Sequence, residues 1–263
     1  MSLRVKTGLI LLAVFLVVLS FGGPGVFALA VAVLGAVGAR EYHSLAAPGA
    51  NPLEAAFTPL WAAAVILSFL GRSGGATSAV LALGAAAYFA AWITGPGPRP
   101  DMFERWAASL GAAVVIGVFL GHAVWVRGHG IAPVLFLCLV VWAGDTAAYY
   151  AGTAFGTHRL APAVSPKKSV EGAVASVAAS AAIGALLGAT LPLPHSAAVS
   201  LVLGIVLNVA AQLGDLAESL WKRCAGVKDS GHLFPGHGGV LDRMDGFLLA
   251  LPLYAAYLRL TVG

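Results

Sequence analysis

The sequence predicts an all-α integral membrane protein that crosses the bilayer several times, and three observations support this. Hydrophobic residues make up 59% of the 263 residues and charged residues only 10%, with a mean hydropathy of +0.90, whereas an ordinary soluble domain carries about 25% charged residues. Apolar runs of about 17–25 residues, long enough to span hydrocarbon, recur along the chain. These runs lack the alternating polarity of a transmembrane barrel, and helices satisfy their own backbone hydrogen bonds in lipid.

Nine transmembrane helices are predicted, at approximately 5–21, 25–40, 55–71, 76–94, 106–126, 131–151, 172–193, 197–221 and 243–261. The first resembles a signal peptide, because Arg4 and Lys6 precede it and the triplet 28–30 resembles a cleavage site. The apolar sequence nevertheless continues through that triplet into the second span. We therefore expect an uncleaved anchor.

The basic residues predict that the N-terminus lies in the cytoplasm. With this orientation only Arg72, Arg127 and Arg259 fall outside, which agrees with the excess of Lys and Arg in cytoplasmic loops. The other twelve fall on the cytoplasmic side: Arg4, Lys6, Arg40, Arg99, Arg105, Arg159, Lys167, Lys168, Lys222, Arg223, Lys228 and Arg243. The net charge of +4 is thus explained by membrane orientation, and nucleic-acid binding need not be invoked.

Acidic residues concentrate in the second half of the chain. Ionisable residues inside a span are costly and usually face a polar cavity or a partner. Seven of the eleven acidic residues lie in or beside three cytoplasm-facing stretches: Asp145, Glu171, Asp215, Glu218, Asp229, Asp242 and Asp245. This clustering predicts one site at the cytoplasmic face, with residues 1–130 forming a scaffold of helices and residues 131–263 carrying the chemistry.

The eighth span carries a polar stripe. Its members are spaced 4, 3, 4 and 3 apart, which places them on one helical face: Asn208, Gln212, Asp215, Ser219 and Lys222. Interhelical hydrogen bonding explains Asn208 and Gln212. It explains Asp215 poorly, because a carboxylate in that environment needs a cation.

The segment KRCAGVKDSGHLFPGHGGVLDRMD, residues 222–245, combines glycine-rich backbone with charge. Such backbone can approach a ligand closely. Cations suited to phosphate oxygens are Lys222, Arg223, Lys228 and Arg243. Asp242 and Asp245 stand three apart at the start of the ninth span. Carboxylates near a helix N-terminus are also ordinary caps, and this alternative stays open for Asp245.

Asp215 and Asp242 are the best candidates for a metal pair. Oxygen ligands without Cys suit a hard cation such as Mg²⁺, and a carboxylate from each of two helices could hold one or two ions together with phosphate oxygens. His237 could be a metal ligand, a donor to phosphate or a residue that braces the loop, whereas His232 is expected to be structural.

The segment SPKKSVEG, residues 165–172, is a second candidate phosphate site. Ser165 starts an extended turn, and Lys167 and Lys168 precede a helix predicted to begin near Ser169, which together resemble an anion site. A solvated basic loop is the alternative. Asp145, at the cytoplasmic end of the preceding span, could join the metal cluster or pair with a lysine.

Carboxylates, cations and glycine-rich backbone at a membrane surface indicate phosphoryl or nucleotidyl transfer. The spacing matches neither a Walker A loop nor a kinase motif set, and no Ser/His/Asp triad is evident. The residues alone predict a metal-dependent membrane enzyme that acts on phosphate esters.

The stretch 219–245 resembles the signature of the phosphatidate cytidylyltransferase (CDP-diacylglycerol synthase) family. Its matching residues are Ser219, Lys222-Arg223, Lys228-Asp229, His237-Gly238-Gly239 and Asp242-Arg243-Met244-Asp245. GDLAES at 214–219 is similar to the family's lead-in, SPKKSVEG to its Ser-Pro-Lys-Lys-Thr-Trp-Glu-Gly element, and Asp145 with Tyr149 to the segment before it. The departures, Trp221, Ser169 and Val170, remove no charge and no metal ligand.

The resemblance implies transfer of CMP from CTP to phosphatidate, giving CDP-diacylglycerol and pyrophosphate, at the cytoplasmic face of the cell membrane. It implies Mg²⁺ held by Asp215 and Asp242, as two ions or with a second, monovalent cation, and it is compatible with a homodimer. The residues expected to act in catalysis are Asp215, Asp242, Asp245, Lys168 and Lys222. Those expected to bind substrate are Asp145, Ser165, Lys167, Ser219, Arg223, Lys228, His237, Gly238, Gly239 and Arg243.

Three alternatives stay open at this stage. One is a CTP-dependent cytidylyltransferase or kinase that acts on an isoprenoid lipid. Another is a transporter for an anionic lipid or phosphate, although transporters often bind ions at the bilayer midplane between repeats and no repeat is visible here. The third is a structural membrane scaffold, although a scaffold would have no need for the three aspartates Asp215, Asp242 and Asp245.

Overall fold

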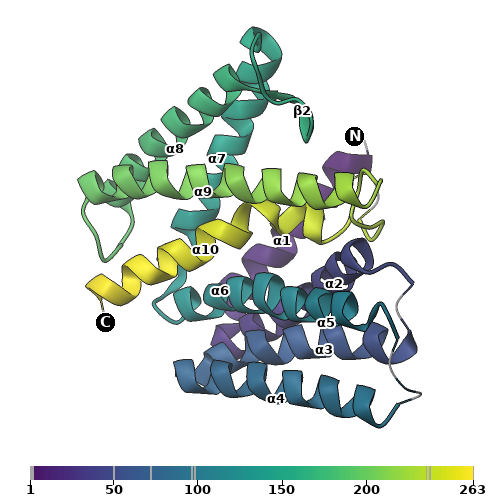
Figure 1. Cartoon of the computed structure of the whole chain (residues 1–263). Coiled ribbons are helices and arrows are strands. Elements are labelled where there is room, and N and C mark those ends of the chain that lie inside the picture. The colour runs from purple at the N-terminus through teal and green to yellow at the C-terminus, as the bar shows by residue number, and fades with distance from the viewer. Residues whose placement is uncertain are drawn as a thin grey trace. The chain divides into compact units, whose positions relative to one another are not determined.

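A computed structural model describes residues 3–262, apart from 50, 72, 96, 98, 235 and 237, and confirms the all-α membrane architecture (Figure 1). Within this part of the chain, a helix coincides with each predicted span. The helices are α1 Leu3–Phe21, α2 Gly23–Ala46, α3 Pro52–Ser68, α4 Gly74–Ile93, α5 Met102–Gly111, α6 Phe119–Arg127, α7 Ile131–Phe155, α8 Val170–Thr190, α9 Ala197–Cys224 and α10 Leu241–Thr261. A 3₁₀ turn, η1 Phe69–Gly71, follows α3, and a π-helical stretch, η2 Ala112–Val118, joins α5 to α6.

Among the described residues, seven helical runs are long and apolar enough to cross a membrane. They are Gly23–Ala46, Pro52–Gly71, Gly74–Ile93, Met102–Arg127, Ile131–Phe155, Val170–Thr190 and Ala197–Cys224. The apolar part of α1 is shorter, Val5–Phe21, and α10 begins with a charged turn at Asp242, Arg243 and Asp245. The crossing of the bilayer by these two helices stays a prediction.

The chain divides into two compact units. The N-terminal unit consists of Met1–Gly128 together with Cys224–Arg243, and the C-terminal unit consists of His129–Arg223 together with Met244–Gly263. The first division falls close to residue 130, where the scaffold was expected to end. The signature loop after α9, however, packs with the N-terminal unit.

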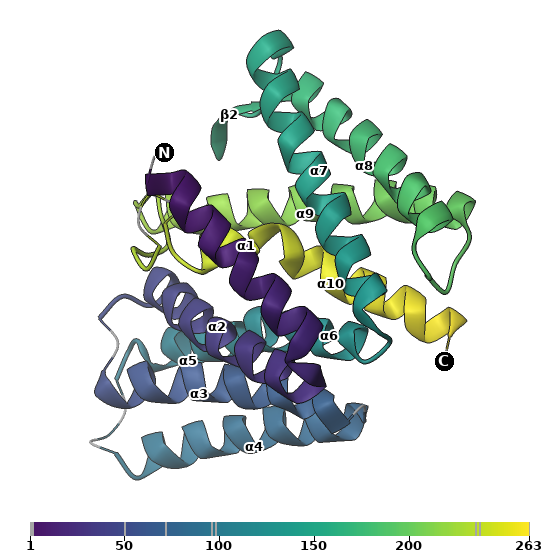
Figure 2. The same ribbon diagram turned by 180° about the vertical axis from the view of Figure 1, so that it is seen from behind.

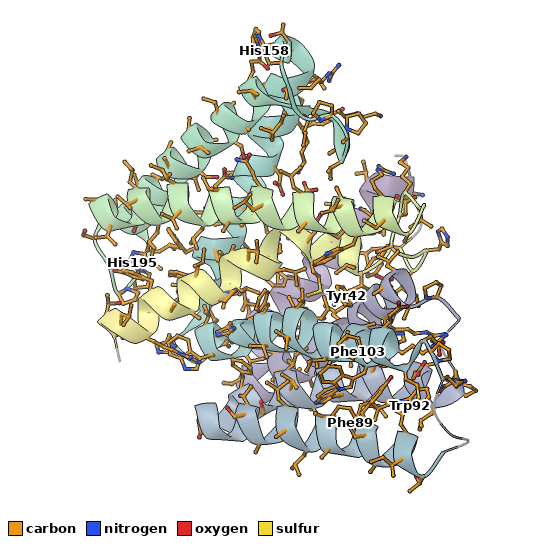
Figure 3. All side chains as sticks on the ribbon, viewed as in Figure 1. Tyr42, Phe89, Trp92, Phe103, His158 and His195 are labelled. Atoms are coloured by element: carbon orange, nitrogen blue, oxygen red, sulfur yellow. The ribbon has the colours of Figure 1, made fainter. Side chains whose placement is uncertain are left out.

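In the N-terminal unit, neighbouring helices of the chain pack side by side. α2 packs against α3, and α3 packs against both α4 and η2 (Figure 2). Small residues allow the close approaches: a Cβ atom on Gly35 of α2 would lie 2.2 Å from Cδ1 of Ile66 on α3. Away from this interface, Phe89 of α4 and Phe103 of α5 both contact the Trp106 ring (Figure 3).

In the C-terminal unit, α7 and α8 pack along one another, and a short hairpin joins them. Its strands, β1 Arg159–Ala161 and β2 Ser165–Ser169, pair antiparallel. Ser169 then caps α8 by accepting a hydrogen bond from the Gly172 amide at 3.1 Å. This confirms the helix start predicted after the two lysines, and it places Lys167 and Lys168 on β2.

Asn208 of α9 hydrogen-bonds to α8, as the interhelical interpretation of the polar stripe predicts. Its Nδ2 donates to Ser176 Oγ at 2.9 Å, and its Oδ1 accepts from Gln212 Nε2 at 2.7 Å. A Cβ atom on Gly144 of α7 would lie 2.1 Å from Asn208 Nδ2. The absence of a side chain at Gly144 therefore lets α7 approach this hydrogen-bonded pair.

His195 anchors the turn between α8 and α9 (Figure 3). Its Nδ1 lies 2.7 Å from Ser200 Oγ, and its Nε2 lies 3.0 Å from the hydroxyl of Tyr254 on α10. Burial lowers the pKa of His195 below its usual value, which favours the neutral ring. The histidine thus links the turn before α9 to α9 and to α10 within the C-terminal unit.

Candidate functional site

Four elements of the C-terminal unit bring charged side chains together. We call this set the carboxylate–lysine cluster: Asp145 of α7, Lys168 of β2, Asp215 and Lys222 of α9, and Asp245 of α10. Lys168 Nζ lies 2.5 Å from Asp215 Oδ2. Asp245 interacts electrostatically with Asp215, with Asp145 and with Lys222. Residues separated by up to 100 positions in the sequence therefore share one electrostatic environment.

A close approach of α9 and α10 produces this grouping. A Cβ atom on Gly214 would lie 2.4 Å from the carbonyl oxygen of Asp245, so only glycine fits there without a shift of the helices. The next residue along α9 is Asp215, whose Oδ1 accepts a hydrogen bond from Ser219 Oγ at 3.4 Å. Asp245 Oδ1 accepts from the Gly246 amide at 2.8 Å. The glycine in GDLAES thus brings the two aspartates near each other.

The C-terminal end of α9 carries two cations of the signature, Lys222 of the cluster and Arg223. Lys222 forms an ion pair with Glu218, whose side chain is fully buried one helical turn earlier. Arg223 Nε donates to the carbonyl oxygen of Val164 at 3.2 Å. Arg223 therefore lies beside the hairpin that carries Lys167, which is exposed. This gathering of cations fits the expected handling of phosphate.

In the N-terminal unit, Asp242 organises the loop that precedes it. Its Oδ2 accepts three hydrogen bonds, from the amide and the hydroxyl of Ser230 at 2.9 and 2.8 Å and from the Gly239 amide at 2.8 Å. Gly238 has φ +80°, and a Cβ atom on it would lie 2.6 Å from Asp242 Oδ2. The glycines of the signature are needed here for backbone conformation and for close approach.

The other signature residues of this loop are only partly described. Lys228 and Arg243 are exposed. His237 lies outside the described residues, so its three alternative roles stay predictions.

Glu41 is a residue that the sequence analysis missed. It lies on α2 and is 9% exposed. Its Oε1 accepts from the Val240 amide at 3.1 Å, and its Oε2 accepts from the Leu241 amide at 2.8 Å and from Ser230 Oγ at 3.1 Å. The available signal was an acidic residue directly after the predicted end of the second span, where α2 in fact continues to Ala46.

Similarity to known proteins shows the family of this chain. A profile of the cytidylyltransferase family matches residues 2–261. The chain belongs to the cytidylyltransferase family. It is 31% identical over 256 residues to the phosphatidate cytidylyltransferase of Staphylococcus haemolyticus, an alignment that covers 96% of this chain and 97% of that protein.

Two further relatives align over a shorter region. The phosphatidate cytidylyltransferase of Staphylococcus epidermidis is 39% identical over 147 residues, 56% of each chain. That of Bacillus subtilis is 38% identical over 144 residues, 54% of each chain. In these two alignments the chain matches about half the length of the relative.

For a member of this family, the position of metal ligands is of particular interest. The described residues contain no group of three or more His, Cys, Asp or Glu side chains placed to hold a metal ion. Mg²⁺ in proteins is commonly held by one or two carboxylates plus substrate phosphates, so a smaller set suffices. Asp215 and Asp242 belong to different units, and their pairing as metal ligands stays a prediction from the sequence.

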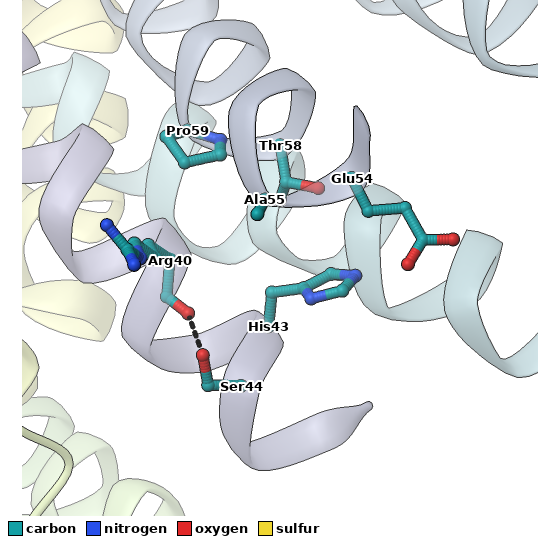
Figure 4. Close-up of a pocket in the computed structure, with 7 residues that line it drawn as sticks. All are labelled: Arg40, His43, Ser44, Glu54, Ala55, Thr58 and Pro59. Carbon is teal, nitrogen blue, oxygen red and sulfur yellow. Dashed lines mark hydrogen bonds between the residues drawn. The ribbon is translucent and has the colours of Figure 1, made fainter. Parts of the chain in front are cut away.

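The N-terminal unit of this family member also contains a polar pocket (Figure 4). Its lining residues are Arg40, His43, Ser44, Glu54, Ala55, Thr58 and Pro59. The Ser44 hydroxyl donates to the carbonyl oxygen of Arg40 at 2.8 Å, and buried Glu54 forms an ion pair with Arg105 at 3.0 Å. None of the residues predicted to act in catalysis or binding lines this pocket.

Proposed function

We propose that the chain is a phosphatidate cytidylyltransferase. A phosphate oxygen of phosphatidate would attack the α-phosphorus of CTP, and the bond from that phosphorus to the oxygen shared with the β-phosphate would break. The products are CDP-diacylglycerol and pyrophosphate. The family, the names of the three relatives and the long signature at 219–245 support this proposal.

The observation that carries the proposal is the carboxylate–lysine cluster. Its three carboxylates lie beside two lysines, and one of these, Lys222, also pairs with Glu218. A site with both charges can receive the phosphates of a nucleotide together with a cation. The nucleophile in the proposed reaction is an anionic phosphate, so it needs no strong general base.

Mg²⁺ fits the chemistry of this donor set, because carboxylate oxygens are the ligands that it prefers. We propose that Asp215 is one of its ligands, with Asp242 as the second on the basis of the sequence. Held by these residues, Mg²⁺ would supply Lewis-acid stabilisation of the negative charge that develops on pyrophosphate. A second metal ion or a monovalent cation is part of the same proposal.

The protein's own side chains would bind and orient the two polyanions. Lys168, which pairs with Asp215, would exchange this partner for a substrate phosphate, because an ammonium group can rotate to a new acceptor. Lys167 and Arg223 flank it on and beside the hairpin. Asp245 and Asp145 would orient these cations, and the loop with Lys228, Gly238 and Gly239 would shape the nucleotide pocket.

The test is conversion of labelled CTP and phosphatidate by the purified protein in detergent, first with Mg²⁺ and then with EDTA. Formation of CDP-diacylglycerol that depends on Mg²⁺ is the expected result. CTP binding without product would indicate that the acceptor is a different lipid phosphate. An isoprenoid phosphate would then be tested as the acceptor. A folded protein that binds no CTP would overturn the proposal in favour of transport.

The location of the reaction is proposed from the distribution of basic residues. We place the N-terminus and the reaction on the cytoplasmic side of the cell membrane. Protease protection in oriented vesicles tests this orientation, and cross-linking in the membrane tests the homodimer.

A further inference from the structure

The signature loop of the N-terminal unit is held by a carboxylate from outside the signature. We propose that Glu41 is a positioning residue that fixes the active conformation of this loop, residues 225–240 apart from 235 and 237, for the cytidylyl transfer proposed above. The effect of Glu41 on catalysis rests on that proposed function. Its effect on the position of the loop rests on the geometry alone.

Glu41 accepts hydrogen bonds from two separate parts of the loop and from the start of α10. The Ser230 hydroxyl comes from its first half, whereas the Val240 and Leu241 amides come from its end and from the first residue of α10. Both amides are buried, so a lost acceptor would leave them unpaired. They also lie at the positive N-terminal end of α10, where a carboxylate is favoured.

The loop is shaped around this carboxylate. A Cβ atom on Gly231 would lie 2.3 Å from Glu41 Oε1, and one on Gly239 would lie 2.5 Å from both carboxylate oxygens. A side chain at either position would therefore displace the Glu41 carboxylate from the position in which it accepts these hydrogen bonds. The second of them belongs to the His-Gly-Gly element that the family resemblance assigns to substrate binding.

Ser230 couples Glu41 to Asp242. Its hydroxyl oxygen lies 3.1 Å from Glu41 Oε2 and 2.8 Å from Asp242 Oδ2, and its single hydrogen can be donated to one of them at a time. The Ser230 amide donates to Asp242 as well. Loss of Glu41 would therefore disturb the loop next to an aspartate that the sequence assigns to metal binding.

The experiment compares Glu41→Gln and Glu41→Ala with Glu54→Gln in the full-length protein in detergent. The Gln side chain can accept from one of the two buried amides but presents its NH₂ group to the other. The loop should therefore be disturbed less in Glu41→Gln than in Glu41→Ala. We expect kcat/KM to fall about 10-fold in Glu41→Gln and about 100-fold in Glu41→Ala, as for a buried donor left without its charged acceptor. Glu54→Gln, which lies in the same unit and breaks the ion pair with Arg105, should lower the melting temperature while the folded protein keeps its kcat/KM.

A second measurement reports the loop without reference to catalysis. Lys228 is exposed within the loop, and trypsin should cut there several times faster in Glu41→Ala than in the wild type or in Glu54→Gln. Unchanged cleavage at Lys228 together with unchanged kcat/KM would overturn the role of Glu41. Faster cleavage in a protein whose wild type makes no CDP-diacylglycerol would support the role of Glu41 while rejecting the proposed reaction.

Discussion

Carboxylates serve two different purposes in the two units of this protein. In the C-terminal unit, Asp215 pairs with Lys168 and shares its surroundings with Asp245. In the N-terminal unit, Glu41 and Asp242 accept mainly from backbone amides and from Ser230. The first arrangement has ammonium partners, which a substrate phosphate would replace in the proposed reaction, whereas the second has mainly backbone partners and defines a backbone conformation. Residue type alone does not distinguish a carboxylate that would bind a metal ion or a cation from one that stabilises a backbone conformation.

The largest effect expected from this comparison is at Asp215. Asp215→Asn keeps the shape but removes the charge that would hold both Mg²⁺ and Lys168. We expect kcat/KM to fall roughly 1,000-fold, since a metal ion supplies several kcal/mol of charge stabilisation in the transition state, while the melting temperature changes little. Steady-state kinetics and tryptophan fluorescence of the same preparation measure the two quantities. Near-normal turnover would contradict the proposed role of Asp215 in the site.

Asp242→Asn tests whether one aspartate both binds and braces. The Asn carbonyl can still accept from Ser230 and Gly239, so the loop should keep its resistance to trypsin. Loss of the charge should lower kcat/KM about 100-fold and raise the Mg²⁺ concentration needed for half-maximal rate. A Mg²⁺ titration checks this. An unchanged Mg²⁺ requirement with full activity would show that Asp242 holds the loop and does not bind the metal ion.

Lys168→Gln should have a smaller effect, because other cations remain beside the hairpin. We expect a 10-fold loss of kcat/KM, about 1.4 kcal/mol, expressed mainly in KM for one of the two phosphate substrates. The neighbouring variant Lys167→Gln is the matched comparison, since Lys167 is exposed and should cost less. Equal effects of the two variants would favour a general basic surface over a specific contact of Lys168 with substrate.

The smallest effect on activity is expected at His195. It hydrogen-bonds to Ser200, which lies 15 residues before Asp215 on α9, about 22 Å at 1.5 Å per residue. His195→Ala should destabilise the C-terminal unit by about 1–2 kcal/mol through lost hydrogen bonds to Ser200 and Tyr254, while the folded protein keeps its kcat/KM. Thermal unfolding in detergent followed by activity assays measures both.

The same histidine predicts a pH dependence of stability. The rings of Phe136, Tyr254 and Tyr257 pack against it. Because burial lowers the pKa of His195 from 6.5, the unfolded chain binds the proton more readily, and stability should fall as the pH drops below about 6.5. This part of the loss should be absent in His195→Ala. An identical pH profile for both proteins would contradict it.

The sequence by itself determined the membrane class, the positions of the helices and the family. Long apolar runs leave the bilayer as their only solvent, and the spacing of Ser219 through Asp245 is specific enough to identify the signature. It also identified interhelical bonding at Asn208 and the helix start after Lys168. Each of these follows from local composition or from spacing along one helix.

Only the tertiary structure decided the partners of the charged groups. The pairing of Lys168 with Asp215 depends on how β2 packs near α9, and the contact of Glu41 with Leu241 joins residues 200 positions apart. Periodicity contains no information about such long-range contacts, because they depend on where glycines such as Gly214 and Gly239 allow backbones and side chains to meet. For the same reason the signature loop packs with the N-terminal unit, although in the sequence it lies between α9 and α10.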